Sequence, residues 1–179
     1  LLDVADYGIS SVFITWEGVI SIFATLSLSG GVYNVAMTKY EKDVETVTSS
    51  MIGLTAVASI LVYVFCILIN AVFPQLFGLS VSYLIFMWVQ TFTNAATTFW
   101  LMRKRYTYDY KKVIAYTFSN AILSPVVAII AVKLVEDNKA YAKVIGSGLW
   151  GIIVGVAIMV MLVYKGKKLY HKEYWKYAL

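Results

Sequence analysis

Residues Ile52 to Phe73 read IGLTAVASILVYVFCILINAVF, an apolar stretch without a charged side chain. At about 1.5 Å of rise per residue, roughly 20 helical residues span the ~30 Å hydrocarbon core of a bilayer. This stretch is therefore long enough to cross a membrane as a single helix.

Four further stretches have a similar length and composition. They are Ile9–Leu28, Val81–Leu101, Val113–Leu134 and Val144–Tyr164. Hydrophobic residues make up 60% of the 179 residues and charged residues only 14%, which is too apolar for a soluble domain to bury. The sequence predicts an all-α, polytopic integral membrane protein, with five transmembrane helices in a bundle.

Lysine and arginine gather in alternate connectors. Twelve of them lie in residues 29–50, 102–112 and 165–179, whereas the opposite side has only three, Lys133, Lys139 and Lys143. The positive-inside rule makes the twelve-charge side cytoplasmic, so we expect residue 1 outside and residue 179 in the cytoplasm. The net charge of +5 reflects this topology, and no nucleic-acid partner is expected.

The two ends of the sequence indicate that the protein is longer. Leu1 is not a methionine, and an outside N-terminus without a visible signal peptide suggests a preceding span. Residues 174–179 resemble an interfacial belt of aromatic residues and lysine that leads into another span. We expect an interior fragment.

Polar side chains form a stripe along four of the five predicted helices. At about 100° per residue, Glu17 aligns with Ser21, Gln90 aligns with Asn94, and Asn120 lies in the stripe of the fourth helix. An unpaired polar group in hydrocarbon costs several kcal/mol, so the stripes predict a bundle with a polar interior. The candidate cavity or coupling residues are Glu17, Gln90, Asn94 and Asn120.

Glu17 is the only acidic residue well inside a predicted span. A carboxylate at that depth costs about 2.5–3.5 kcal/mol, so it requires a partner, a proton or water. Two interpretations stay open: a residue of a hydrated cavity, coupled to a proton or sodium gradient, or a carboxyl that only fixes helix packing. For Gln90, Asn94 and Asn120, hydrogen bonding between helices is the favoured interpretation.

Small residues and a proline mark the last two predicted helices. Ser147, Gly151 and Gly155 repeat at intervals of four residues, which predicts close approach of another helix. Pro125 lacks an amide donor and predicts a kinked or loosened turn. Pro125, Gly151 and Gly155 are candidate hinge or packing residues, and static packing is the simpler interpretation.

The connector 102–112 combines five positive charges with three tyrosines. Guanidinium groups bind diphosphate oxygens through paired hydrogen bonds, so Arg103 and Arg105 are candidate diphosphate contacts at the cytoplasmic boundary. The alternative is topological anchoring and attraction to anionic lipid. The sequence contains no metal-ligand spacing, nucleophile with a base or phosphate loop, so we expect no catalytic residues, no metal, no cofactor and no enzymatic activity.

Several short patterns, taken in order, resemble one family. They are Asp6-Tyr-Gly8, Ile22-Phe-Ala-Thr-Leu26, Ser29-Gly-Gly-Val-Tyr-Asn34, Phe99-Trp100 with Arg105-Tyr106, Lys139-Ala-Tyr-Ala142 with Gly146, and Glu173-Tyr-Trp-Lys-Tyr177. The chain resembles a bacterial polysaccharide flippase of the Wzx type, in the multidrug/oligosaccharidyl-lipid/polysaccharide exporter superfamily.

The resemblance implies a two-lobed transporter of about 12–14 helices in the bacterial cytoplasmic membrane, with this chain as a partial N-terminal lobe. The implied partners are the lipid bilayer, the missing first helix and second lobe, and an undecaprenyl-diphosphate-linked oligosaccharide. Alternating access would move this substrate to the outer leaflet for capsule, O-antigen or exopolysaccharide assembly. The spans depart from this expectation because they hold no deep arginine or lysine.

Two alternatives share these features. A drug or cation antiporter of the same superfamily would have the same helices and carry a small amphipathic substrate. A membrane-embedded glycan polymerase or ligase is a further alternative, although the connectors 74–80 and 135–143 are short for its active site.

Overall fold

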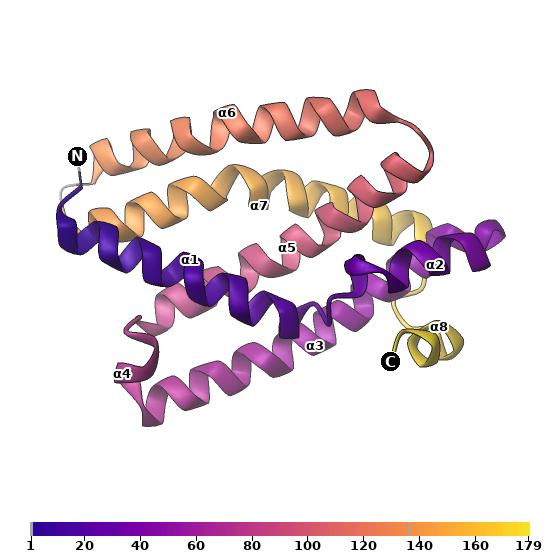
Figure 1. Ribbon diagram of the computed structural model, residues 1–179, viewed down its shortest axis with the longest axis horizontal. Helices are drawn as coiled ribbons and strands as arrows, with labels where there is room; N and C mark the ends of the chain where they lie inside the picture. Colours follow the sequence, from indigo (N-terminus) through magenta and orange to yellow (C-terminus); the bar gives the residue numbers. More distant parts are fainter. Residues whose placement is uncertain (1, 136) are drawn as a thin grey trace.

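The computed structural model describes residues 2–135 and 137–179, which are built of helices and contain no strand. The helices are α1 (Val4–Ala24), α2 (Val32–Lys39), α3 (Val44–Val72), α4 (Pro74–Phe77), α5 (Val81–Tyr106), α6 (Tyr110–Leu134), α7 (Lys139–Gly166) and α8 (Lys172–Ala178). Two short 3-10 turns, Leu28–Gly30 and Glu41–Asp43, flank α2. The five long helices run back and forth along the longest axis of the molecule (Figure 1).

Four helical segments of the described chain are long and apolar enough to cross a membrane. They are Val4–Ala24, Glu41–Val72, Tyr110–Leu134 and Lys139–Gly166. The helical membrane class is thus confirmed, but the predicted fifth span, 81–101, is not among the four. It forms α5, a helix of 26 residues whose polar side chains lower its hydropathy. Thr91, Thr93 and Thr97 of α5 are buried among other helices, so these polar groups are shielded from lipid.

The helix ends differ from the predicted spans. The helix α1 ends at Ala24 rather than Leu28, because Leu26 and Ser27 adopt left-handed backbone angles, with φ of 51° and 46°. The helix α3 begins at Val44 rather than Ile52, so residues 44–50 belong to a helix and not to the connector. Hydropathy marks the apolar part of a helix, whereas backbone hydrogen bonding continues into the polar interface. The remainder of the connector contains the short helix α2.

Three connectors meet at one end of the bundle, which we call the basic end. Arg103 Nη2 pairs with Glu45 Oε1 at 3.0 Å, which joins the end of α5 to the start of α3. Ser49 Oγ donates to the Lys168 carbonyl at 2.7 Å, which joins the segment after α7 to α3. At the opposite end, the Lys143 ammonium lies 4.7 Å from the ring centroid of Tyr7. The chain therefore places the predicted connectors 29–50, 102–112 and 165–179 together.

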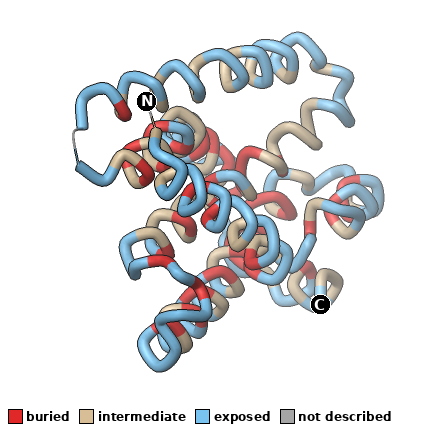
Figure 2. Tube along the Cα trace, turned by 60° about the vertical axis from the view of Figure 1, so that its left-hand side comes forward, coloured by how far each residue is buried: buried red, intermediate tan, exposed pale blue. Residues whose placement is uncertain are grey.

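The core divides into two clusters along the bundle axis. One, near the basic end, is centred on Tyr33 and Phe99, whose rings meet edge to face with centroids 4.8 Å apart. The other contains Phe13, Tyr63 and Met87. Figure 2 shows that buried positions, in red, lie mainly on the inner faces of the helices, while much of the outer surface is exposed. Large apolar side chains on that surface suit contact with lipid.

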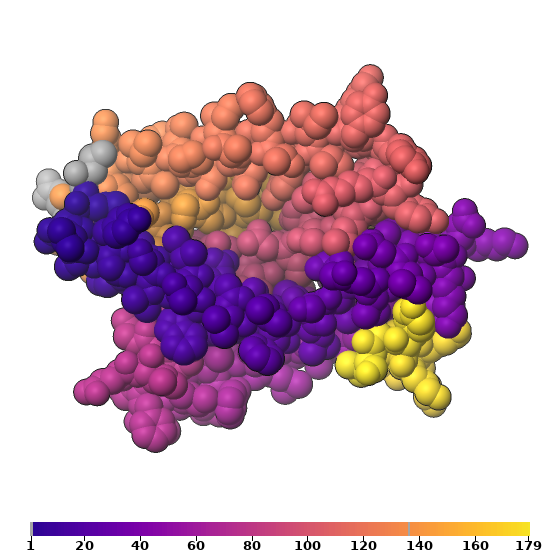
Figure 3. All heavy atoms as spheres, in the orientation of Figure 1, coloured from indigo at the N-terminus to yellow at the C-terminus, as the bar shows by residue number. Residues whose placement is uncertain are grey.

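The C-terminal helix α8 packs against the start of α3 at the basic end. The Tyr174 hydroxyl donates to Asp43 Oδ2 at 2.5 Å, and the Trp175 indole donates to the Ser50 carbonyl at 3.0 Å. Figure 3 shows α8, in yellow, against the purple surface of the α2–α3 region. The tail therefore forms part of the folded unit.

Candidate functional site

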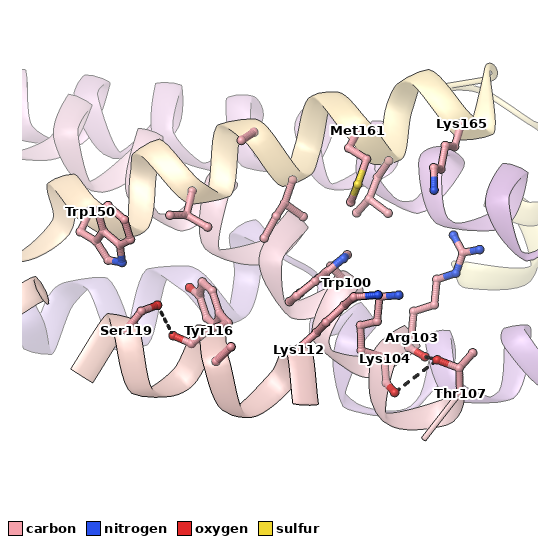
Figure 4. Close-up of a pocket in the computed structure, with 15 residues that line it drawn as sticks. Trp100, Arg103, Lys104, Thr107, Lys112, Tyr116, Ser119, Trp150, Met161 and Lys165 are labelled. Atoms are coloured by element: carbon pink, nitrogen blue, oxygen red, sulfur yellow. Dashed lines mark hydrogen bonds between the residues drawn. The ribbon is translucent and has the colours of Figure 1, made fainter. Parts of the chain in front are cut away.

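A cavity of about 740 Å³ lies between α5, α6 and α7 near the basic end. We call it the basic cavity (Figure 4). The helix α6 packs closely along α7 but only sparsely against α5, so α5 and α6 diverge from the turn that joins them. The cavity occupies the wedge between them.

The mouth of the basic cavity is cationic. It is lined by Arg103, Lys104, Lys112 and Lys165, which gather at one end of the close-up in Figure 4. Two carboxylates compensate part of this charge. Glu45 pairs with Arg103, and Asp109 Oδ2 accepts from Lys104 and Lys112 Nζ at 3.1 and 2.9 Å. Hydrogen bonds from the two lysines hold the pKa of Asp109 below its usual range. The mouth retains an excess of two positive charges.

The interior of the basic cavity is aromatic and apolar. Trp100 and Tyr116 lie on facing sides of the wedge, with ring centroids 6.2 Å apart, and Trp150 lies farther from the mouth. The remaining wall comes mainly from α7, including Val154 and Met161. An anionic group bound at the mouth would therefore adjoin a surface suited to an apolar chain or to the face of a ring.

A second cavity, of about 400 Å³, separates α1 from α5. We call it the Glu17 cavity. Glu17 and Ser21 line it from α1, and Thr91, Asn94 and Thr98 line it from α5. The polar stripe predicted for residues 9–28, which is on α1, therefore faces a polar stripe of α5. The side-chain amide of Gln90 also approaches the Glu17 carboxyl. A coupling role for these residues stays a prediction.

Small residues of α7 pack against the polar face of α5. A methyl group at Gly151 would lie 3.8 Å from the Oδ1 atoms of both Asn94 and Asn120, so this glycine lies between the two amides. Gly148 packs directly against Gln90 Oε1, which is buried and has no hydrogen-bond partner among the described residues. The structure thus brings Gln90, Asn94 and Asn120 to one interface beside the small-residue face of α7.

Pro125 does not break α6, which continues from Tyr110 to Leu134. The adjacent Ser124 Oγ donates to the Ser147 carbonyl on α7 at 2.5 Å. This bond ties the proline-containing turn to the small-residue helix. Gly155, the other predicted packing residue, contacts Thr93 of α5 so closely that an added methyl group would lie 2.9 Å from its Cβ.

The two arginines singled out in the sequence have different positions. Arg103 lines the basic cavity, whereas Arg105 is exposed and does not line it. Residues two apart on a helix differ in direction by about 200°, so only one of the pair can face α7. Trp150 and Lys165 belong to no motif that marks a binding site in the sequence. Helical spacing alone places both on one face of α7, with Val154 and Met161.

Comparisons with protein-family models, curated proteins and solved structures found no match for this chain. Within residues 2–135 and 137–179, no group of three or more histidine, cysteine, aspartate or glutamate side chains is placed to hold a metal ion. The candidate site therefore rests on the geometry of the two cavities.

Proposed function

We propose that the chain belongs to a transporter that flips undecaprenyl-diphosphate-linked oligosaccharides across the bacterial cytoplasmic membrane. One observation carries the proposal: the basic cavity joins a cationic mouth to an aromatic and apolar wall. A polyisoprenyl diphosphate is likewise an anionic group joined to an apolar chain. The match in charge and polarity along the cavity supports this substrate class.

The proposed orientation has the basic end in the cytoplasm. The excess of lysine and arginine in the connectors at that end supports it through the positive-inside rule. All five long helices, including α5, then cross the bilayer as part of one lobe. The cavity mouth lies at the inner leaflet, where a lipid-linked oligosaccharide made in the cytoplasm would be bound.

Each part of the basic cavity has a proposed role. Arg103, Lys112 and Lys165 bind the diphosphate oxygens, and the α7 wall around Val154 and Met161 holds the first isoprene units. Arginine suits this task because its planar guanidinium donates two parallel hydrogen bonds to phosphate oxygens. Trp100 and Tyr116 provide flat surfaces for sugar rings that adjoin the diphosphate.

The Glu17 cavity supplies a proposed site for energy coupling. Glu17 takes up the proton or sodium ion whose gradient drives the transport cycle, and the neighbouring hydroxyl and amide groups solvate it. The position of this carboxyl in a polar cavity between α1 and α5 supports the role. Alternating access would then change the hydration of Glu17 as the helices move.

A pair of matched variants tests the substrate assignment in the full-length protein in its own host. Arg103→Gln combined with Lys112→Gln removes two charges from the mouth, and Arg105→Gln combined with Lys111→Gln removes two charges outside it. Loss of a charged hydrogen bond typically costs about 1.5–3 kcal/mol, so we expect the first pair to lower surface glycan at least about tenfold. Lipid-linked oligosaccharide should accumulate in the inner leaflet.

The control pair should export glycan at the normal level. Normal export by the mouth variant, at a normal amount of membrane-inserted protein, contradicts the proposed substrate site. Equal losses in both pairs would also contradict it, because they would point to the general charge of the connector.

A further inference from the structure

An apolar groove of about 700 Å³ runs along α3 and α7 next to α8. It is distinct from both cavities described above, since none of its lining residues lines either of them. Ile52 and Val57 contribute from α3, Val160 and Val163 from α7, and Phe92 from α5. Its walls expose almost no polar surface, so the body of the groove suits a hydrocarbon chain.

The groove changes in character toward the basic end of the bundle. Its lining there becomes aromatic, with Tyr164, Tyr170 and Trp175. The rings of Tyr170 and Trp175 meet edge to face, with centroids 4.9 Å apart. Tyrosine and tryptophan concentrate where hydrocarbon gives way to lipid headgroups. The order of apolar wall, aromatic rim and charged end is the order of acyl chain, glycerol region and phosphate in a lipid leaflet.

Lysines lie next to the rim residues of the groove in the sequence. Lys167 and Lys168 directly precede its lining residues Leu169 and Tyr170, and Lys172 opens α8. All three are exposed and form no ion pair with the carboxylates of the described chain. Lys167 and Lys168 also line a pocket with Glu41, Asp43 and Glu45, and the charge of Lys168 helps to lower the pKa of Asp43. Lys42, Arg103 and Lys165 line the same pocket, so its five basic side chains outnumber its three carboxylates and this region keeps a net positive charge.

The rim is fixed by hydrogen bonds and close packing. The Trp175 indole donates to the Ser50 carbonyl at 3.0 Å, and Ser49 Oγ donates to the Lys168 carbonyl at 2.7 Å. Gly53 lets the backbone of Leu169 approach α3 so closely that a methyl group there would collide with it. These contacts hold residues 167–169 beside the apolar groove. The basic side chains and the groove therefore lie next to each other in the folded protein.

We propose that this groove binds one anionic phospholipid from the leaflet at the basic end. Its acyl chain lies between α3 and α7, and its phosphate lies among Lys167, Lys168 and Lys172. Each lysine near an anionic surface strengthens lipid binding. Burial of the acyl chain in the apolar groove strengthens it further. The proposal depends only on membrane insertion and is independent of the transport proposal.

Quenching of Trp175 fluorescence by brominated lipids tests the site in the full chain. The protein is placed in phosphatidylcholine bilayers that contain a small fraction of either brominated phosphatidylglycerol or brominated phosphatidylcholine. The Trp175→Phe variant gives the signal of the other tryptophans, Trp16, Trp88, Trp100 and Trp150, for subtraction. We expect the relative association constant at Trp175 to favour phosphatidylglycerol by at least about fivefold.

Two double variants of equal charge separate a site from general attraction. Lys167→Gln with Lys168→Gln should lower the preference to near one. Arg105→Gln with Lys111→Gln should leave it unchanged, because these residues line neither the groove nor the pocket of Lys167 and Lys168. A preference near one in the unmodified protein overturns the proposal. Equal loss of the preference in both variants, or no quenching of Trp175 by either lipid, overturns it as well.

Discussion

Arg103 at the end of α5 and Glu45 at the start of α3 form an ion pair with an Nη2–Oε1 distance of 3.0 Å. The pair joins two helices at the basic end, and Arg103 also lines the basic cavity. Glu45 therefore competes with any anion that binds Arg103. This relationship connects the stability of the bundle end to the proposed binding site.

Glu45→Gln should have a small effect on stability and a larger one on anion binding. The arginine and glutamate side chains are 24% and 47% exposed, so solvent screens the pair and its loss should cost at most about 1 kcal/mol. Free Arg103 should then bind a polyisoprenyl diphosphate more tightly, by about twofold to fivefold. Denaturant unfolding in detergent and equilibrium binding measure the two effects. Weaker binding by Glu45→Gln would contradict the competition.

Two glycines on the same face of α7 should differ sharply in their tolerance of alanine. A methyl group at Gly155 would lie 2.9 Å from Thr93 Cβ, so Gly155→Ala should destabilise the protein by about 1–3 kcal/mol through overpacking. At Gly151 the closest contacts are 3.8 Å, and helix propensity favours alanine by about 0.5–1 kcal/mol. Unfolding midpoints in the same detergent compare the two. Equal destabilisation would contradict the packing of α7 on α5.

The sequence alone allowed much of the helical architecture to be predicted, because the apolar stretches are long and the polar stripes have helical spacing. Thr55, Ser59 and Asn70 lie on one face of α3, and all three are buried, as a bundle with a polar interior requires. The helix ends were less predictable. The start of α3 at Val44 and the end of α1 at Ala24 depend on backbone angles and contacts that hydropathy does not encode.

The cavity mouth could be predicted only in part. Arg103 and Arg105 have the same chemistry, and their different exposure depends on how α5 faces α6 and α7. Lys165 joins the mouth from a region distant in sequence, because α7 returns to the basic end. The docking of α8 on α3 was not predicted either, since it depends on single polar contacts such as that of Tyr174 with Asp43.

Glu17→Gln tests the proposed coupling role in the full-length protein. Glutamine keeps the size of the side chain but cannot ionise, so transport driven by a proton or sodium gradient should fall to the level seen without the gradient. Binding of substrate to the basic cavity should change less than about twofold, because Glu17 lines the other cavity. Ser21→Ala, in the same cavity, serves as a matched control and should retain coupling. Gradient-driven transport by Glu17→Gln at the normal rate would remove this residue from the mechanism.

Docking of α8 should depend on pH through Asp43. The hydrogen bond from Tyr174, followed by that from Thr46, holds the pKa of Asp43 below its ordinary value. A carboxyl with a lowered folded-state pKa stabilises the folded state above its unfolded pKa, and this contribution is lost as pH falls through the folded value. Hydrogen-exchange protection of residues 172–178 should therefore fall below about pH 4 in the unmodified protein.

Tyr174→Phe removes the largest cause of the shift and should lower protection of α8 at pH 7 by about threefold to tenfold. The fall in protection between pH 7 and pH 3 should also become smaller, since the pKa of Asp43 returns toward its unfolded value. Tyr177→Phe is the matched control, because Tyr177 packs edge-on against Tyr40 and its hydroxyl does not bond Asp43. Equal pH dependence in the unmodified protein and in Tyr174→Phe would mean that another contact holds α8 on α3.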